Sequence, residues 1–281
     1  MLLRCRSRTL DLSRPIVMGV LNVTPDSFSD GGRYERSDRA IEHAIEMVEH
    51  GAALIDVGGE STRPGAEPVS EDEELGRVIP IIRALTQRLE IPISIDTSKP
   101  GVMTAAIEAG AELINDVYAL RAPGALEAAA GSGAAVCLMH MHGEPRTMQS
   151  APQYGDVVAE VRDFLQQRVE TCLRAGISLD RLLIDPGIGF GKRLEHNLAL
   201  LASIAELDVF ERPILIGVSR KSMFGALLGR AVDERLPGAL AVAIASVLAG
   251  ARIIRTHDVR ETVDALATVM ALKSAGYATT R

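Results

Sequence analysis

The chain has 281 residues, 47% of them hydrophobic, and a formal net charge of −7 at pH 7. A chain of this length and apolar content can bury a large core. Because it is acidic, has only 3% aromatic residues and contains no tryptophan, it lacks the basic face and the stacking platform of nucleic-acid binders. We therefore expect one domain and no nucleic-acid partner.

The cysteines and the apolar segments indicate the cellular compartment of the chain. Cys5, Cys137 and Cys172 are odd in number and far apart, which excludes a disulfide framework and a zinc site readable from spacing, so we expect a reducing cytoplasm. Met1–Arg8 has arginines where a signal peptide needs an apolar core. Gly238–Gly250 is the most apolar run, but a membrane span needs about 18 such residues, so we expect a buried or interface helix and no membrane partner.

In chain order, a terminal segment and a first strand precede seven repeats of the same plan. Leu2–Leu12 alternates around a turn and predicts a β-hairpin that covers one end of the molecule. Ile16–Leu21 is a short, nearly unbroken apolar run, which predicts a strand buried on both faces, with Asn22 at its carboxyl end. Turn formers on both sides place Phe28 and Asp30 on the loop that follows.

Seven further units each contain an apolar strand and a helix. The predicted strands begin at Ala53, Pro92, Leu113, Ala135, Leu182, Pro213 and Ala251. The helices are predicted over 37–50, 70–89, 99–109, 156–175, 197–207 and 236–249, with a short alanine-rich helix from Pro123 and a last helix from Val259. Ser70 and Glu73 have the spacing of a capping box at the start of the second of these helices.

Eight strand–helix units without a linker predict an α/β fold, a (β/α)8 TIM barrel in one domain over residues 1–281. An open, doubly wound sheet is the alternative, but it would gather its functional residues at one switch point. Polar side chains instead end nearly every predicted strand, as a ring around one pocket requires. They are Asn22, Asp56 to Thr62, Asp96, Asn115, His140, Asp185, Lys221, Arg255 and His257.

Two carboxylates, an amide and a lysine in this set suit a flat heterocycle. Asp96 and Asp185 directly follow apolar strands, and a carboxylate accepts two parallel N–H bonds from a guanidine-like ring edge, as it does from arginine. Asn115 is placed similarly, and Lys221 would donate to a ring carbonyl. Taken alone, Asp185 is equally consistent with a cap on the turn or helix that follows Pro186–Gly187.

A second group of polar residues suits an anion. Arg255 and His257 alternate along the eighth strand and therefore face the same way, next to Asn22 on the first strand. Arg220 and Lys221 follow the seventh strand, where barrels commonly hold phosphate. The alternatives are a structural histidine at His257 and a solvated basic pair after the seventh strand.

Three loop motifs are weaker signals. Gly187–Lys192 lacks the spacing of a phosphate-binding P-loop, so its glycines predict a tight turn or a close approach to a ligand. His140–His142 has no third ligand at metal-site spacing, which argues against zinc, and Met139 beside it is interpreted as pocket wall. The polar loop after the second strand is either a connection or a closing loop in which Arg63 pairs with Asp30.

Long motifs of the chain resemble those of bacterial dihydropteroate synthases. They are MGVLNVTPDSFSDGG (18–32), DVGGESTRPG (56–65), DPGIGFGK (185–192), SRK (219–221) and RTHDV (255–259). The resemblance spans nearly the full chain. It implies a folate-pathway enzyme that joins 6-hydroxymethyl-7,8-dihydropterin diphosphate to p-aminobenzoate, forms 7,8-dihydropteroate and diphosphate, uses Mg²⁺ and works as a homodimer.

The resemblance also implies a role for each residue that matches the family's motifs. The pterin site would be Asp96, Asn115, Asp185, Lys221, Met139 and Arg255. The p-aminobenzoate site, where sulfonamides would compete, would be Thr62, Pro64, Phe28, Phe190, Ser219 and Lys221. The diphosphate site would be Asn22, Arg63, Arg255 and His257, with Mg²⁺ on Asn22 near Asp30. The implied catalytic residues are Asp96, Lys221, Arg255, Asp30 and Arg63.

The implied chemistry is dissociative. Diphosphate leaves with its charge neutralised, Asp96 stabilises a pterin methylene cation, and the weakly basic aniline attacks without a general base. Two alternatives are a non-catalytic pterin-binding barrel, similar to the folate-binding module of corrinoid-dependent methyltransferases, and a Mg²⁺-dependent aldolase or phosphate-handling barrel. The loops after the first two strands favour the synthase over the first, and Lys221 lies beyond its strand, which argues against a Schiff-base aldolase.

Overall fold

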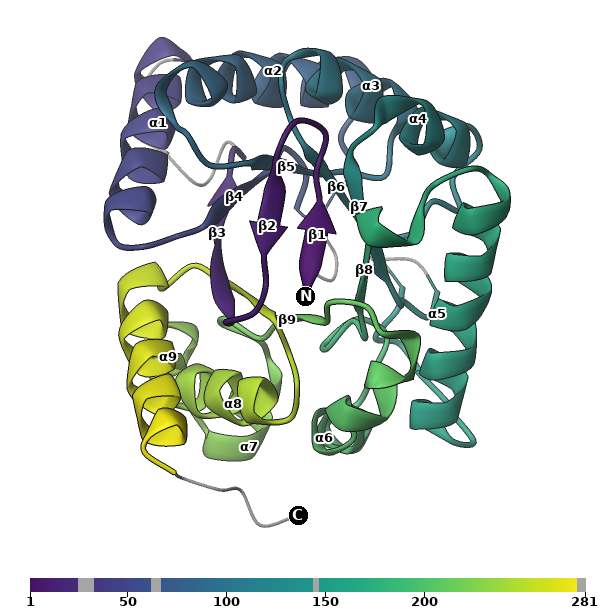
Figure 1. Cartoon of the computed structure of the whole chain (residues 1–281), viewed down its shortest axis with the longest axis vertical. Coiled ribbons are helices and arrows are strands. Elements are labelled where there is room, and N and C mark those ends of the chain that lie inside the picture. The colour runs from purple at the N-terminus through teal and green to yellow at the C-terminus, as the bar shows by residue number, and fades with distance from the viewer. Residues whose placement is uncertain (25–32, 62–66, 144–146, 277–281) are drawn as a thin grey trace.

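Eight parallel strands curl into a barrel in the computed structural model, which describes residues 1–24, 33–61, 67–143 and 147–276 (Figure 1). They are β3 (Ile16–Asn22), β4 (Leu54–Gly58), β5 (Ile93–Asp96), β6 (Leu113–Asp116), β7 (Ala135–Met139), β8 (Leu182–Asp185), β9 (Leu215–Gly217) and β10 (Ile253–Thr256). Their order in the sheet is β8-β7-β6-β5-β4-β3-β10-β9. Every predicted strand is therefore present.

The two ends of this order meet, which makes the sheet a barrel. Ile184 of β8 forms a parallel bridge with Ile214, next to β9, and the Ile184 N–H donates to the Pro213 carbonyl at 3.0 Å. The predicted barrel is confirmed, and the open, doubly wound alternative is wrong.

The helices form a ring outside the strands (Figure 1). They are α1 (Arg33–Glu49), α2 (Glu71–Arg88), α3 (Pro100–Glu108), α4 (Ala125–Ser132), α5 (Val157–Arg174), α6 (Leu194–Ala202), α7 (Met223–Leu228), α8 (Leu236–Leu248) and α9 (Val259–Ser274). Their apolar sides pack on the outward side chains of the strands, as Ile81 and Leu85 of α2 do. Within the described ranges, no helix has the length and apolarity of a membrane span.

Alternation along the strands decides which side chains enter the barrel. An apolar cluster fills its amino-terminal half, to which the strands contribute Met18, Leu54, Leu113, Ala135, Cys137, Leu183, Leu215 and Ile253. Two residues further along, the same faces of most of these strands carry Asp56, Asn115, Met139, Asp185 and Arg255. The period of two therefore sets polar side chains at the carboxyl ends, above an apolar floor.

The predicted N-terminal hairpin is confirmed and lies across the amino-terminal end of the barrel (Figure 1). Its antiparallel strands are β1 (Leu2–Arg4) and β2 (Thr9–Asp11). Leu3 and Leu12 are fully buried in the apolar cluster inside the barrel. The buried carboxylate of Glu112, just before β6, accepts the N–H groups of Ser7 and Arg8 at 3.0 Å each and so ties the hairpin turn to the barrel.

Two helical segments differ from the prediction. The helix expected over 197–207 begins earlier, because the His196 ring accepts the Arg193 N–H at 3.2 Å and caps α6 there. It continues after Ser203 only as a 3₁₀ segment, Ile204–Phe210. The structure also contains the short helix α7, between β9 and α8.

Half of the expected capping box forms at the start of α2. The Ser70 hydroxyl accepts the Glu73 N–H at 3.3 Å, as predicted. The Glu73 carboxylate does not reach back to Ser70, because it pairs with Arg77 one turn further along the helix.

Leu12→Ala tests whether the hairpin stabilises the barrel. The Leu12 side chain is 0% exposed, so its truncation should lower the free energy of unfolding by roughly 2–5 kcal/mol in urea denaturation. Leu2→Ala is the matched control on the same hairpin, because Leu2 is 60% exposed, and should change it by less than about 0.5 kcal/mol. Equal effects of the two substitutions on the free energy of unfolding would contradict the stabilising role of the hairpin.

Candidate active site

Arg255 of β10 connects four strands at the carboxyl end of the barrel. Its Nε donates to Asp56 Oδ2 of β4 at 2.6 Å, and its Nη2 donates to Asp96 Oδ2 of β5 at 2.7 Å. The Asn115 amide of β6 donates to the same Asp56 oxygen at 2.9 Å. These side chains therefore form one hydrogen-bond network across the mouth of the barrel.

Burial and charge set the protonation of this network. Burial raises the pKa of Asp96 to about 7, although the Arg255 guanidinium opposes the shift. Burial would lower the pKa of Arg255, but Asp56 and Asp96 outweigh it and raise that pKa. Arg255 is therefore a permanent cation, whereas the charge of Asp96 near neutral pH depends on the partner it meets.

Asp185 of β8 and Lys221, after β9, are the second charged pair of the site. The Gly187 N–H donates to Asp185 Oδ1 at 2.7 Å, and burial raises the pKa of Asp185 against the effect of this bond. The turn-capping alternative is thus present, but it engages one carboxylate oxygen only. Burial, together with repulsion from Arg255, lowers the pKa of Lys221 to about 8, and its Nζ lies 4.0 Å from the centre of the Phe190 ring.

Asn22, His257 and Ser219 form a third polar group. Asn22 Nδ2 lies 3.4 Å from His257 Nε2, so Asn22 and His257 lie side by side, as expected. Ser219 Oγ lies 3.0 Å from His257 Nδ1 and donates to Asp258 Oδ2 at 3.2 Å, so this hydroxyl is engaged with His257 and Asp258. Arg220 pairs with Asp258 at 3.0 Å and does not act together with Lys221.

Asn22 is the described residue that best suits a magnesium ion. Its Nδ2 is directed to the imidazole of His257, so its amide oxygen is the atom that can serve as a ligand for a cation. Mg²⁺ typically keeps several waters and takes one or two protein oxygens plus substrate phosphates. Among the described residues, no three His, Cys, Asp or Glu side chains form a metal cluster. The donor set therefore fits a Mg²⁺ held mainly by a diphosphate.

His140 does not face the mouth of the barrel, contrary to the expected ring of polar residues. Its Nδ1 lies 2.9 Å from the Nζ of Lys192, below the glycine-rich loop that follows β8. Burial lowers the pKa of Lys192 to about 7. The histidine and the lysine thus support the loop from beneath.

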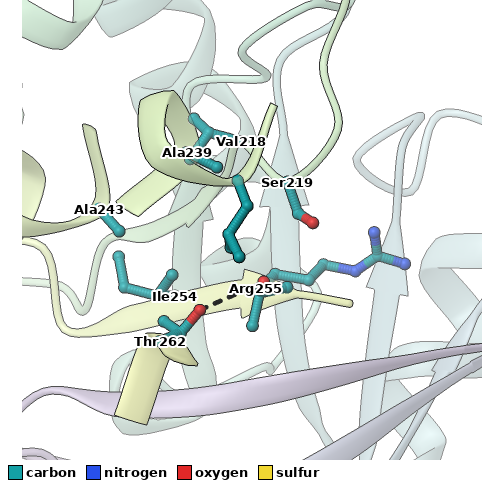
Figure 2. Close-up of a pocket in the computed structure, with 9 residues that line it drawn as sticks. Val218, Ser219, Ala239, Ala243, Ile254, Arg255 and Thr262 are labelled. Carbon is teal, nitrogen blue, oxygen red and sulfur yellow. Dashed lines mark hydrogen bonds between the residues drawn. The ribbon is translucent and has the colours of Figure 1, made fainter. Parts of the chain in front are cut away.

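A small cavity beside Arg255 is a packing gap and not the substrate site. It lies between the outer face of β10 and the helices α8 and α9, and Figure 2 shows the Arg255 side chain extending away from it. Its volume is about 10 Å³, enough for one water at most. The apolar side chains around it are Val218, Leu236, Ala239, Ala243 and Ile254.

The structure brings most of the predicted site residues that it describes to one mouth. Met139 packs with the partly buried ring of Phe190, as a pocket wall would. The predicted residues Phe28, Asp30, Thr62, Arg63 and Pro64 lie outside the described residues. The prediction placed Asp56 in the ring of polar residues around the pocket but did not expect its pairing with Arg255. It gave no role to Lys192, because no pattern in the sequence indicates that this lysine is buried.

The sequence is similar to those of known proteins of one family. The model of the pterin binding enzyme family matches residues 18–257. The dihydropteroate synthase of Escherichia coli strain K12 is 55% identical over 275 residues, which cover 98% of this chain and 98% of the relative.

Solved structures share the fold as well. Yersinia pestis dihydropteroate synthase in a sulfonamide drug complex is 55% identical, with a TM-score of 0.93 over 98% of this chain and 100% of that one. Burkholderia cenocepacia dihydropteroate synthase complexed with 7,8-dihydropteroate is 47% identical, with a TM-score of 0.88 over 98% of this chain and 97% of that one. The chain therefore belongs to the dihydropteroate synthase family of pterin-binding enzymes.

Proposed function

We propose that the chain is a transferase that condenses 6-hydroxymethyl-7,8-dihydropterin diphosphate with p-aminobenzoate to 7,8-dihydropteroate and diphosphate. The observation that carries the proposal is the network of Asp56, Asp96, Asn115 and Arg255, with Asp185 and Lys221 at the same mouth. The sulfonamide and 7,8-dihydropteroate bound to relatives support the same ligand classes here.

The pterin binds flat on the carboxyl ends of the strands. Asp185 accepts N–H bonds from the guanidine-like edge of the ring, because a carboxylate matches two parallel donors. Asn115 and Asp96 bind the other edge, and the Lys221 ammonium donates to the ring carbonyl. Arg255 stacks on the face of the ring, above the wall formed by Met139.

The diphosphate binds beside the pterin at the first and last strands. Arg255, His257 and the Asn22 amide surround it, and the family resemblance adds Arg63. Asn22 would hold Mg²⁺, which when bound neutralises charge on the leaving group. Arg255 thus stabilises the negative charge that develops as the carbon–oxygen bond breaks.

The substitution proceeds through a pterin methylene cation. Its positive charge spreads into the ring, and the buried carboxylate of Asp96 stabilises it in a site of low dielectric. The aniline nitrogen then attacks the methylene carbon and loses a proton afterwards. This nitrogen is a weak base with an available lone pair, so the step needs no general base.

p-Aminobenzoate, or a sulfonamide that competes with it, binds beside the Phe190 ring and Lys221, which contact each other. The family resemblance adds Thr62, Pro64 and Phe28 to this pocket, together with Ser219. Asp30 and Arg63 would close over the substrates and exclude water, which would otherwise trap the cation as an alcohol.

The enzyme would act as a homodimer in the cytoplasm. The exposed apolar side chains Leu227, Leu228 and Val232 lie next to the apolar helix α8 and suit a protein interface. Cys5, Cys137 and Cys172 are buried free thiols, as a reducing compartment allows. Sedimentation velocity should give a dimer, and a monomer at all concentrations would exclude this assembly.

Incubation with pterin diphosphate, p-aminobenzoate and Mg²⁺ tests the activity directly. Mass spectrometry should detect 7,8-dihydropteroate, and its formation should be inhibited by a sulfonamide. A folded protein that binds the pterin but forms no product would favour the non-catalytic pterin-binding barrel.

Asp185→Asn should weaken pterin binding by about 10- to 100-fold, because the amide turns an NH₂ donor toward the ring N–H groups. Isothermal titration calorimetry measures the change. Asp116→Asn is the matched control, because Asp116 is also a buried strand-end carboxylate but is engaged by Ser98 and backbone N–H groups. Unchanged pterin affinity in Asp185→Asn would exclude the assignment.

Lys221→Ala should abolish turnover, because it removes the donor to the pterin carbonyl and one side of the p-aminobenzoate pocket. The neighbouring Arg220→Ala is the control, since Arg220 is 45% exposed and pairs with Asp258. Near-normal turnover in Lys221→Ala would refute the role of this lysine.

Pterin affinity should fall as the pH rises above about 8, where Lys221 loses its proton. Only the protonated Lys221 is the ammonium donor to the pterin carbonyl. Because its folded-state pKa lies below the ordinary value of lysine, this form is lost at a lower pH than for an exposed lysine. Calorimetric titrations between pH 7.5 and 9.5 measure the change. Lys221→Ala lacks the titrating group, so its pterin affinity should not change over this pH range. The same decline of affinity in both proteins would show that another group titrates.

A further inference from the structure

A buried lysine that the proposed mechanism does not use lies beneath the loop after β8. Lys192 is 3% exposed, and its Nζ lies 2.9 Å from the Gly187 carbonyl oxygen, 3.1 Å from that of Phe190 and 3.3 Å from that of His140. A fourth contact of 2.9 Å joins it to His140 Nδ1. An ammonium group has three donors and no acceptor, so this cage of acceptors favours the cation and opposes the burial that lowers the pKa of Lys192 to about 7.

His140 completes the cage as an acceptor. Burial, together with repulsion from Lys192, lowers the pKa of His140 to about 2, so the ring is neutral at physiological pH. Its Nδ1 therefore presents a lone pair to the ammonium group. The Phe164 ring meets the imidazole edge-on, with ring centres 4.9 Å apart, which fixes the orientation of the imidazole.

The glycines of the loop let its backbone lie directly against the segment after β7. Gly187 and Gly191 have φ values of 69° and 61°, and a Cβ at these positions would stand 1.9 Å and 2.5 Å from the carbonyl oxygens of His140 and His142. The Tyr154 hydroxyl holds the end of the loop by donating to the Gly191 carbonyl at 2.8 Å. Lys192 connects the beginning of the loop with Phe190.

The position of Phe190 depends on this connection. Lys192 binds the Phe190 carbonyl. The Phe190 side chain packs against the apolar cluster that contains Met139 and Met148, and its ring centre lies 4.0 Å from the Nζ of Lys221. Asp185, in contrast, belongs to strand β8, and the loop contributes to it only the hydrogen bond from the Gly187 N–H. A change at Lys192 should therefore affect the Phe190 side of the site more than the pterin side.

We propose that Lys192 is a positioning residue for the amine substrate: its ammonium group ties the 187–191 loop to His140 and so holds the Phe190 ring over Lys221. The inference rests on the proposed function, because it assigns Phe190 and Lys221 to the p-aminobenzoate pocket. Lys192 itself touches no substrate.

The test compares Lys192→Met with Arg181→Met. Arg181 is a matched buried cation that also binds carbonyls, through Nε to Ala134 at 2.7 Å and through Nη2 to Ala129 at 3.1 Å, at the amino-terminal end of β8. Both substitutions should lower the melting temperature. Only Lys192→Met should raise the KM for p-aminobenzoate, by roughly tenfold or more, because a small displacement of Phe190 weakens the pocket.

The Kd of the pterin diphosphate should stay within about threefold in Lys192→Met, because Asp185 stays on β8 and can lose at most the hydrogen bond from the Gly187 N–H. An unchanged KM for p-aminobenzoate, or equal changes in KM and pterin Kd, would overturn the proposal and leave Lys192 a purely structural residue.

If Lys192→Met does not fold, Lys192→Gln combined with Phe190→Ala provides a double-mutant cycle. Because Lys192 is proposed to act through Phe190, the two effects on KM should not add, and additive effects would overturn the proposal. The wild-type enzyme separates this inference from the proposed function. Absence of dihydropteroate from the wild type rejects the function, whereas a normal wild type with an unaffected Lys192 variant rejects the inference alone.

Discussion

The bridge from Arg255 to Asp56 and Asp96 is the interaction on which the rest of the site depends. Asp56 is fully buried and Asp96 nearly so, and an unpaired buried charge costs several kcal/mol. By donating to both carboxylates, Arg255 keeps them at the mouth of the barrel, and Asn115 attaches to the Asp56 oxygen that Arg255 already binds. The permanent charge of Arg255 also lowers the pKa of Lys221, so its influence extends beyond the two carboxylates that it binds.

This arrangement lets an acidic chain bind anions. The net charge is −7, whereas both proposed substrates carry negative charge. Attraction therefore has to come from the local field, and Arg255 and Lys221 provide it where burial reduces screening by water. In the proposed reaction, the carboxylates beside them serve the uncharged end of the pterin and the pterin methylene cation. Charges of both signs are thus needed within one mouth, and the pairing of Arg255 with Asp56 and Asp96 brings them together there.

Much of this could be predicted from the sequence, because a strand period of two is visible in the residues. The apolar runs before Asp96 and Asp185 predicted both the strands and the inward direction of their last side chains. The hairpin was predicted from alternation around Ser7–Arg8. The pairing of Asp56 was missed because its partner Arg255 lies 199 positions away. Lys192 was missed because a lysine beside glycines looks exposed, and only the position of His140 shows that it is enclosed. Ser219 is assigned to the amine pocket by resemblance alone, and the sequence did not indicate that its hydroxyl contacts His257 and Asp258.

The hairpin at the other end of the barrel has a consequence for the chemistry as well. Leu3 and Leu12 close the base with side chains that are fully buried, so the interior is blind-ended. In the proposed reaction, the part of the chain that the structure describes would keep solvent from reaching the carbocation through the base of the barrel. Because the hairpin, held by Glu112, closes the amino-terminal end of the barrel, water has to be excluded only at the carboxyl-terminal end.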